Sequence, residues 1–89
     1  MTSVYRPHPN AAWRSLGDRV VAITPDNRQH ELEGEVEVLV WRELAAGARD
    51  LDQLTAAVVR AFDIGEAEAR ADLRDFLEEL VGAGLVNRT

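Results

Sequence analysis

The sequence predicts an α+β domain, because strand-like and helical segments occupy separate parts of the chain. Between residues 13 and 33, short β-favouring runs alternate with turn-forming segments rich in Gly, Pro, Asp and Asn. From residue 35 onward, apolar residues recur at helical spacing in three successive stretches, which glycines separate. We therefore expect a three-stranded antiparallel sheet followed by three helices. At 89 residues, the chain has the length of one small domain.

The first residues show no pattern of regular structure. Pro7 and Pro9 interrupt this part of the chain, and its apolar residues show little periodicity. We expect residues 1–12 to form a mostly irregular N-terminal lead-in and the folded domain to span residues 13–89.

Two of the three expected strands form a hairpin. Residues 13–16 and 19–23 are joined by Gly17-Asp18, and a two-residue Gly-X link is typical of a type II′ turn. Residues 24–27, Thr-Pro-Asp-Asn, predict the turn that leads into the third strand. That strand, residues 28–33, is polar and has few β-branched residues, so its own strand propensity is weak.

Three amphipathic stretches predict the helices. The first begins at Glu35 and ends at Gly47, and Asp50 followed by Gln53 is the capping-box pattern that starts the second. The third begins near Glu66 and stops at the glycines of residues 82–84, before a short extended end. This order of hairpin and helices matches the winged helix-turn-helix layout. The residues expected to face the core are Val36, Leu39, Val40 and Leu44, then Leu51, Leu54, Val58 and Phe62, and finally Leu73, Phe76, Leu77 and Leu80.

The two tryptophans are expected in the core or at its edge, as is usual for large aromatic side chains. Trp13 opens the first strand segment. Trp41 lies off the apolar stripe of the first helix, so we expect it to be partly exposed.

Composition limits the chemistry that the chain offers. There is no cysteine, which excludes a disulfide scaffold, a thiolate metal site and a cysteine nucleophile, and suits a cytoplasmic protein. His8 and His30 lie far apart and make a poor metal-ligand set, so each is interpreted as a surface residue. No phosphate-binding loop, nucleophile motif or supported carboxylate pair occurs. We therefore expect no enzyme activity, no metal and no cofactor.

The charge balance argues against a nucleic-acid partner. Sixteen acidic residues against ten basic residues give a net charge of −6 and a calculated pI of about 4.8. Binding to the phosphates of nucleic acid needs a basic surface, whereas this chain is acidic overall. No segment approaches the ~20 apolar residues of a membrane span, and the first residues lack a signal-peptide pattern. We expect no membrane partner.

Six short sequence features between Trp13 and Val86 occur in the order and at the spacing found in one protein family. They are WRSLGD from Trp13, the single Leu32, WRELAAG from Trp41, DLDQL from Asp50, AFD from Ala61, and DLRDFLEELVGAGL from Asp72. Together they resemble the PqqD-like proteins, also called RiPP recognition elements. Glu33 and Ala45-Ala46 depart from the family pattern, which often has Asn and Leu-Asp there, and these departures concern the subfamily.

The resemblance implies a non-catalytic adaptor that binds the leader segment of a ribosomally made precursor peptide and delivers it to a modifying enzyme. In that family the leader adds a strand beside the third strand, in a groove walled by the third helix. The resemblance implies no cofactor.

On this basis we expect the third strand and one flank of the third helix to contact the peptide. With the apolar stripe against the core, one flank of the helix is acidic and the other combines small residues with arginines. The second flank offers room for apolar anchors and partners for a carboxylate. The expected peptide-binding residues are Arg28, Gln29, His30, Glu31 and Leu32 in the strand, and Ala67, Arg70, Ala71, Arg74 and Glu78 in the helix.

Plainer interpretations stay open. Charges on the third strand would equally guard an exposed edge against aggregation, and Arg70 and Arg74 would equally pair with Glu66 and Glu78. A winged-helix DNA-binding regulator needs a basic recognition helix, whereas residues 66–81 carry two arginines against six acidic residues. A regulatory subunit of a larger enzyme that binds no leader is a further alternative. A homodimer through the open strand edge is another.

Overall fold

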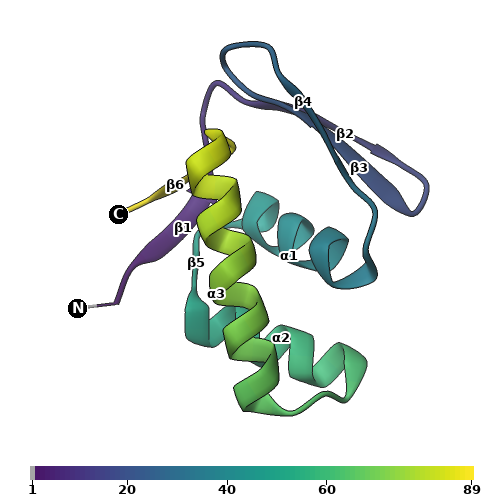
Figure 1. Cartoon of the computed structure of the whole chain (residues 1–89), viewed down its shortest axis with the longest axis vertical. Coiled ribbons are helices and arrows are strands. Elements are labelled where there is room, and N and C mark those ends of the chain that lie inside the picture. The colour runs from purple at the N-terminus through teal and green to yellow at the C-terminus, as the bar shows by residue number, and fades with distance from the viewer. Residues whose placement is uncertain (1) are drawn as a thin grey trace.

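The computed structural model describes residues 2–89, which form three helices and two small antiparallel sheets (Figure 1). One sheet contains β2 (Ala12–Leu16), β3 (Arg19–Ile23) and β4 (Gln29–Leu32), in that order. The α+β class is confirmed, and so is the order of a three-stranded antiparallel sheet followed by three helices. The second sheet was not predicted.

The β2–β3 hairpin has the tight link that its sequence predicts. Leu16 lies opposite Arg19, so two residues join the strands. The first of them, Gly17, has a φ of +67°, a backbone conformation that glycine adopts without steric cost. Arg42 ties this hairpin to the first helix, because its guanidinium donates to Ser15 Oγ at 3.0 Å and to the Gly17 carbonyl at 3.2 Å.

The helices begin and end close to the predicted positions. They are α1 (Glu35–Ala46), α2 (Leu51–Phe62) and α3 (Glu66–Ala83). The capping box of α2 is confirmed: Asp50 Oδ1 accepts from Gln53 N at 2.8 Å, and Gln53 Oε1 accepts from Asp50 N at 2.9 Å. Gly84 ends α3 with a φ of +84°.

The end of α1 differs from the expected glycine cap in one respect. Gly47 follows the last helical residue as predicted, but its φ of 168° is extended rather than left-handed. The chain continues directly into the short strand β5 (Arg49–Asp50), which pairs with β1. Gly47 still donates its N–H to the Leu44 carbonyl at 3.2 Å, and its extended backbone leads the chain toward β5.

The N-terminal segment is more ordered than the sequence indicates. Within the predicted irregular lead-in, β1 (Val4–Pro7) is the central strand of the second sheet, between β5 and β6 (Val86–Arg88). Tyr5 is buried in the core. Both partners of β1 are distant in sequence, so local patterning does not reveal this strand. Met1 lies outside the described residues.

The tryptophans lie in the core and at its edge as predicted, but the expectation that Trp41 is partly exposed is wrong. Trp41 is fully buried and Trp13 is 43% exposed. Their rings meet edge to face, with centroids 6.1 Å apart. The prediction gave α1 a single buried face, but α1 packs against the β2–β3–β4 sheet through Trp41 and against α2 and β1 elsewhere. A second buried face follows from this position.

Candidate functional site

The strand β4 is an edge strand, and its backbone groups divide between its partner and the open side. Thr24 N donates to the Arg28 carbonyl at 2.9 Å, so the backbone carbonyl of Arg28 points toward β3. In an antiparallel ladder successive residues alternate between the two sides. With Val21 opposite Glu31 and Ile23 opposite Gln29, the N–H and C=O groups of Gln29 and Glu31 face the open edge.

The side chains of β4 divide between the two faces of the sheet. Leu32 is buried and His30 half-buried, and both lie on the face that packs against α1. Gln29 and Glu31 lie on the outer face, where they border a hollow with Arg14 and Val21. Each of the five strand residues expected at the site, Arg28, Gln29, His30, Glu31 and Leu32, therefore lies in β4 or directly before it.

The turn before β4 is held by Thr24. Its buried side chain donates to Asp26 and accepts from Arg28 N, the latter at 2.8 Å. The hydrogen bond from Thr24 lowers the pKa of Asp26 below its ordinary value of 3.8, and Arg28 adds to the effect. The Asp26 carboxylate is also 3.3 Å from the Arg28 guanidinium. These contacts define where β4 begins.

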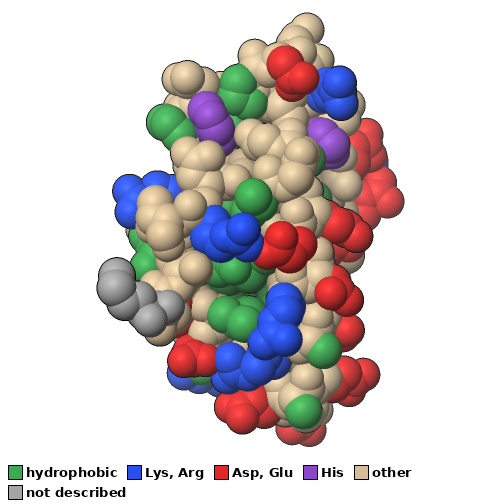
Figure 2. Space-filling view, turned by 60° about the vertical axis from the view of Figure 1, so that its left-hand side comes forward, with side chains coloured by type: hydrophobic (Ala, Val, Ile, Leu, Met, Phe, Trp, Pro, Cys, Tyr) green, Lys and Arg blue, Asp and Glu red, His purple; other side chains and the backbone are tan. Residues whose placement is uncertain are grey.

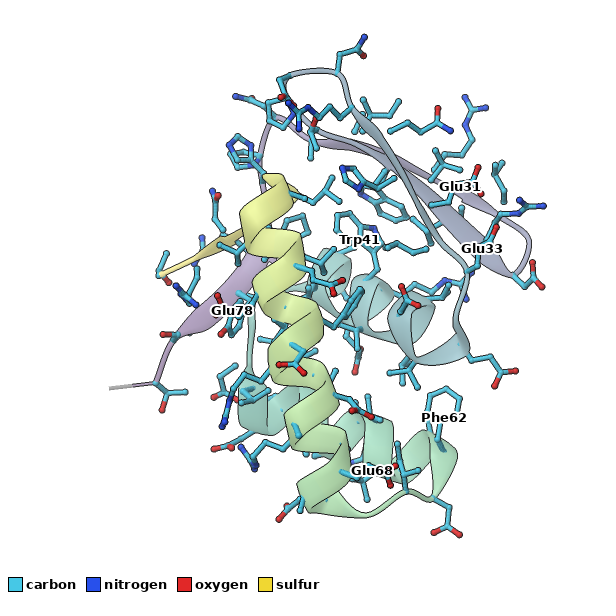
Figure 3. All side chains as sticks on the ribbon, viewed as in Figure 1. Glu31, Glu33, Trp41, Phe62, Glu68 and Glu78 are labelled. Atoms are coloured by element: carbon cyan, nitrogen blue, oxygen red, sulfur yellow. The ribbon has the colours of Figure 1, made fainter. Side chains whose placement is uncertain are left out.

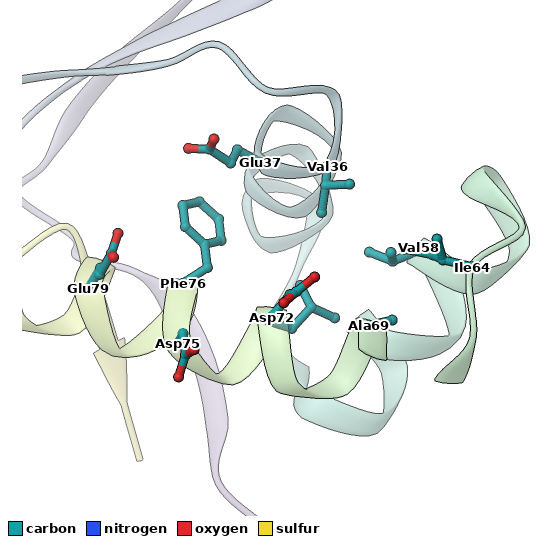
Figure 4. Close-up of a pocket in the computed structure, with 10 residues that line it drawn as sticks. Val36, Glu37, Val58, Ile64, Ala69, Asp72, Asp75, Phe76 and Glu79 are labelled. Atoms are coloured by element: carbon teal, nitrogen blue, oxygen red, sulfur yellow. The ribbon is translucent and has the colours of Figure 1, made fainter. Parts of the chain in front are cut away.

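A cavity of about 300 Å³ lies between α3, the first turn of α1 and the end of α2 (Figure 4). Its apolar walls include Phe76, whose ring projects from α3 toward α1. The full lining comprises Val36, Val58, Ile64, Ala69, Leu73 and Phe76, together with the carboxylates of Glu37, Asp72, Asp75 and Glu79. This cavity combines an apolar floor with acidic walls.

A second hollow lies at the other end of β4. There the turn residues Pro25, Asp26 and Arg28 face residues 81–84 at the end of α3. The first cavity is lined by Val36 and Glu37, which follow the opposite end of β4 after the connection Glu33-Gly34. The helix α3 thus borders hollows at both ends of β4. We infer that the strip between these hollows, from residues 81–84 to Asp72 along α3, can receive a peptide beside β4, and we call it the β4–α3 groove.

The structure places Arg70 and Glu78, two of the helix residues expected to wall this groove, in ion pairs on the side of α3 that faces α2 and β6. Arg70 Nη1 is 2.6 Å from Asp52 Oδ1 on α2, and Glu78 pairs with Arg88 on β6. Figure 3 shows Glu78 on the side of α3 that faces β1 and β6, away from Glu31 and Glu33. The exposed Ala67, Ala71 and Arg74 share the flank of Arg70. Whether any of them touches a peptide stays a prediction.

The reason lies in how α3 packs. The sequence defines two flanks beside the apolar stripe, but the side from which β4 approaches is set by the tertiary fold. In the structure, α3 packs on α2 and β6 with its arginine flank beside them. The acidic flank, with Asp72 and Glu79, therefore borders the cavity.

The two flanks differ in electrostatics. The hydrogen bond that Arg70 donates to Asp52 raises the pKa of Arg70. The pKa of Arg88 is raised by its hydrogen bond to Tyr5, then by the negative charge of Glu78 and by the hydrogen bond that Arg88 donates to Glu78. In the view of Figure 2, Arg side chains gather near the centre of the molecule and acidic side chains lie along its right-hand margin. Among residues 2–89, no ion pair involves the four carboxylates of the cavity.

One signal in the sequence could have identified the acidic flank. Asp75, Glu78 and Glu79 lie in the second half of α3, and no basic residue lies in its last turn. Acidic residues there oppose the helix dipole. Asp72, Asp75 and Glu79 also repel one another at i, i+3 and i, i+4 spacing. Such a cost to stability is common at functional surfaces.

The β4–α3 groove offers three kinds of group for binding. The open edge of β4 supplies backbone N–H and C=O groups, and the cavity supplies apolar side chains and carboxylates. Within residues 2–89, no group of three or more His, Asp or Glu side chains is placed to hold a metal ion. No helix in the same range is both long enough and apolar enough to cross a membrane.

Comparison with known proteins gives one family and one solved structure. Residues 35–86 match the family model described as coenzyme PQQ synthesis protein D (PqqD). The solved structure described as TbiB1 in complex with the TbiA(beta) leader peptide superposes with a TM-score of 0.85. That match covers 92% of this chain and 94% of the other, at 22% sequence identity, and it shows the shared fold. No curated protein matches the chain.

Proposed function

The chain belongs to the PqqD family, and from this premise we propose that it is a non-catalytic adaptor for a ribosomally synthesised precursor peptide. It binds the leader segment of that peptide by strand addition and presents it to a modifying enzyme. The observation that carries the proposal is the open edge of β4, which lies beside the β4–α3 groove. The solved complex of TbiB1 with a leader peptide supports it, because the two chains share a fold.

The open edge supplies the main-chain contacts. Gln29 and Glu31 each present one N–H and one C=O group to an added strand. Main-chain hydrogen bonds of this kind give affinity for any extended segment. Alternate side chains of the leader then point toward the β4–α3 groove, and these give specificity. Residues 28–32 are thus proposed as the strand half of the site.

Proline at position 29 tests strand addition directly. Gln29→Pro removes one outward N–H group and leaves the hydrogen bonds of the β3–β4 ladder in place. We expect the affinity for the leader to fall about tenfold, since a buried hydrogen bond and a steric fit are lost together. The probe is a labelled peptide from a short reading frame encoded beside this chain, titrated by fluorescence anisotropy.

The other edge of the same sheet provides a matched control. Val20 lies opposite both Leu32 and Ser15, and because its backbone bonds to β4, the N–H of Ser15 faces the open edge of β2. Ser15→Pro likewise removes one outward N–H group, on the edge far from α3, together with the hydroxyl that accepts from Arg42. It should leave leader affinity within about twofold. Equal losses for both variants would contradict the choice of β4.

Two parallel titrations separate the competing functions. Duplex DNA that binds at physiological salt would favour a winged-helix regulator. A chain that binds neither DNA nor any leader would favour a regulatory subunit. A second copy at the β4 edge would appear as a dimer that the leader dissociates.

A further inference from the structure

We infer that the leader segment in the β4–α3 groove carries an apolar side chain with lysine or arginine beside it. This inference rests on the proposed function and adds the chemistry of the peptide. It follows from the cavity beside α3, which is apolar at its floor and acidic at its rim.

The apolar part of the site is centred on Phe76. This residue lies on the core stripe of α3, but it is only half-buried, whereas Leu73 and Leu77 on the same stripe are fully buried. Its ring projects toward α1 over a cavity of about 300 Å³, which Val36 and Ile64 also line. A single apolar side chain of an added strand would remove this surface from water.

The acidic part comes from two elements. Glu37 approaches from the first turn of α1, and Asp72 and Glu79 approach from α3, where they lie two turns apart (Figure 4). None of them forms an ion pair with any described residue. The first-turn position suits Glu37, because it lies at the positive end of the α1 dipole. Glu79 has no such compensation.

The arginines that could neutralise this rim lie on the other flank. Arg70 pairs with Asp52 at 2.6 Å, and Arg88 pairs with Glu78. The rim therefore attracts a cationic side chain and repels an anionic one. Attraction and repulsion together give discrimination between leaders.

The test compares two peptides derived from the leader probe. They differ only in the residues that flank the apolar position, which are lysines in one peptide and glutamates in the other. We expect the lysine peptide to bind at least tenfold more tightly at low salt, and the difference to shrink as salt is added. Anisotropy titrations at several salt concentrations give both quantities.

Two double variants, each losing one aspartate and one glutamate charge, locate the effect. Asp72→Asn with Glu79→Gln removes carboxylates from the rim, and it should weaken binding of the lysine peptide about three- to tenfold. Asp18→Asn with Glu43→Gln removes the same number of charges from residues that lie outside this cavity and form no ion pair with a described residue, and it should change binding less than twofold.

The outcomes separate this inference from the function on which it rests. Equal affinity of the two peptides would overturn the inference, while strand addition would stand. Equal effects of the two double variants would overturn it as well, because the affinity would then depend on the net charge of the protein and not on the carboxylates of the rim. If neither peptide binds, the proposed function fails, and the inference fails with it.

Discussion

Phe76 contributes to the packing of α3 on the core and also lines the proposed binding groove. It is half-buried and lines the cavity between α3 and α1. We expect Phe76→Ala to lower leader affinity by about 1–2 kcal/mol, roughly tenfold, because a central aromatic anchor is lost from the groove. Isothermal titration with the leader peptide measures this loss.

Phe62 provides the control for that variant. It is likewise half-buried, but it lies at the end of α2 beside Leu39 and Arg42, in a different hollow. Phe62→Ala should lower the free energy of unfolding to a similar extent as Phe76→Ala and leave leader affinity unchanged. A parallel loss of affinity in both variants would assign the effect of Phe76 to stability alone.

Single residues also show where sequence patterns lose their power. The α1 pattern identified Val40 and Leu44 correctly, but it placed Trp41 partly outside, whereas Trp41 is fully buried. One periodic stripe describes one buried face, and α1 has two neighbours on different sides. Phe76 was predicted as core alone, because its partial exposure depends on the gap between helices.

The strand β1 joins the N-terminal segment to the core. It lies between β5 and β6, and Tyr5 is only 7% exposed. Tyr5→Ala should lower the free energy of unfolding by about 3–5 kcal/mol, as is usual when a buried aromatic ring is truncated. Urea denaturation followed by tryptophan fluorescence measures the change.

An exposed neighbour on the same strand is the control. Arg6→Ala keeps the backbone of β1 and removes a solvent-exposed side chain, so it should change stability by no more than about 0.5 kcal/mol. If Tyr5→Ala were equally mild, the N-terminal segment would not be part of the core.

Elements with local signals were predictable, and elements with distant partners were not. The Gly17 turn and the Asp50–Gln53 capping box each lie within a few residues, and both appear as predicted. The strand β1 bonds to residues 49–50 and 86–88, so its pairing depends on the folded chain. Its own composition carries no comparable signal.

At the scale of the whole molecule, we propose that the arrangement of charge decides which surface receives the leader. The fold class and the edge strand followed from segment order and from the resemblance to a family. The rotation of α3 relative to β4 did not follow, because both flanks satisfy the same apolar stripe. Packing on α2 and β6 turns Arg70 and Glu78 away from the groove. The acidic flank remains beside the β4–α3 groove.

Amide hydrogen exchange, resolved by residue and measured with and without the leader peptide, tests strand addition at β4 most directly. The backbone N–H groups of Gln29 and Glu31 face the open edge of β4, and those of Trp13 and Ser15 face the open edge of β2. We expect the leader to slow exchange at Gln29 and Glu31 and to leave Trp13 and Ser15 unchanged. Protection of Trp13 and Ser15, or of neither pair while the leader is bound, would contradict strand addition at β4.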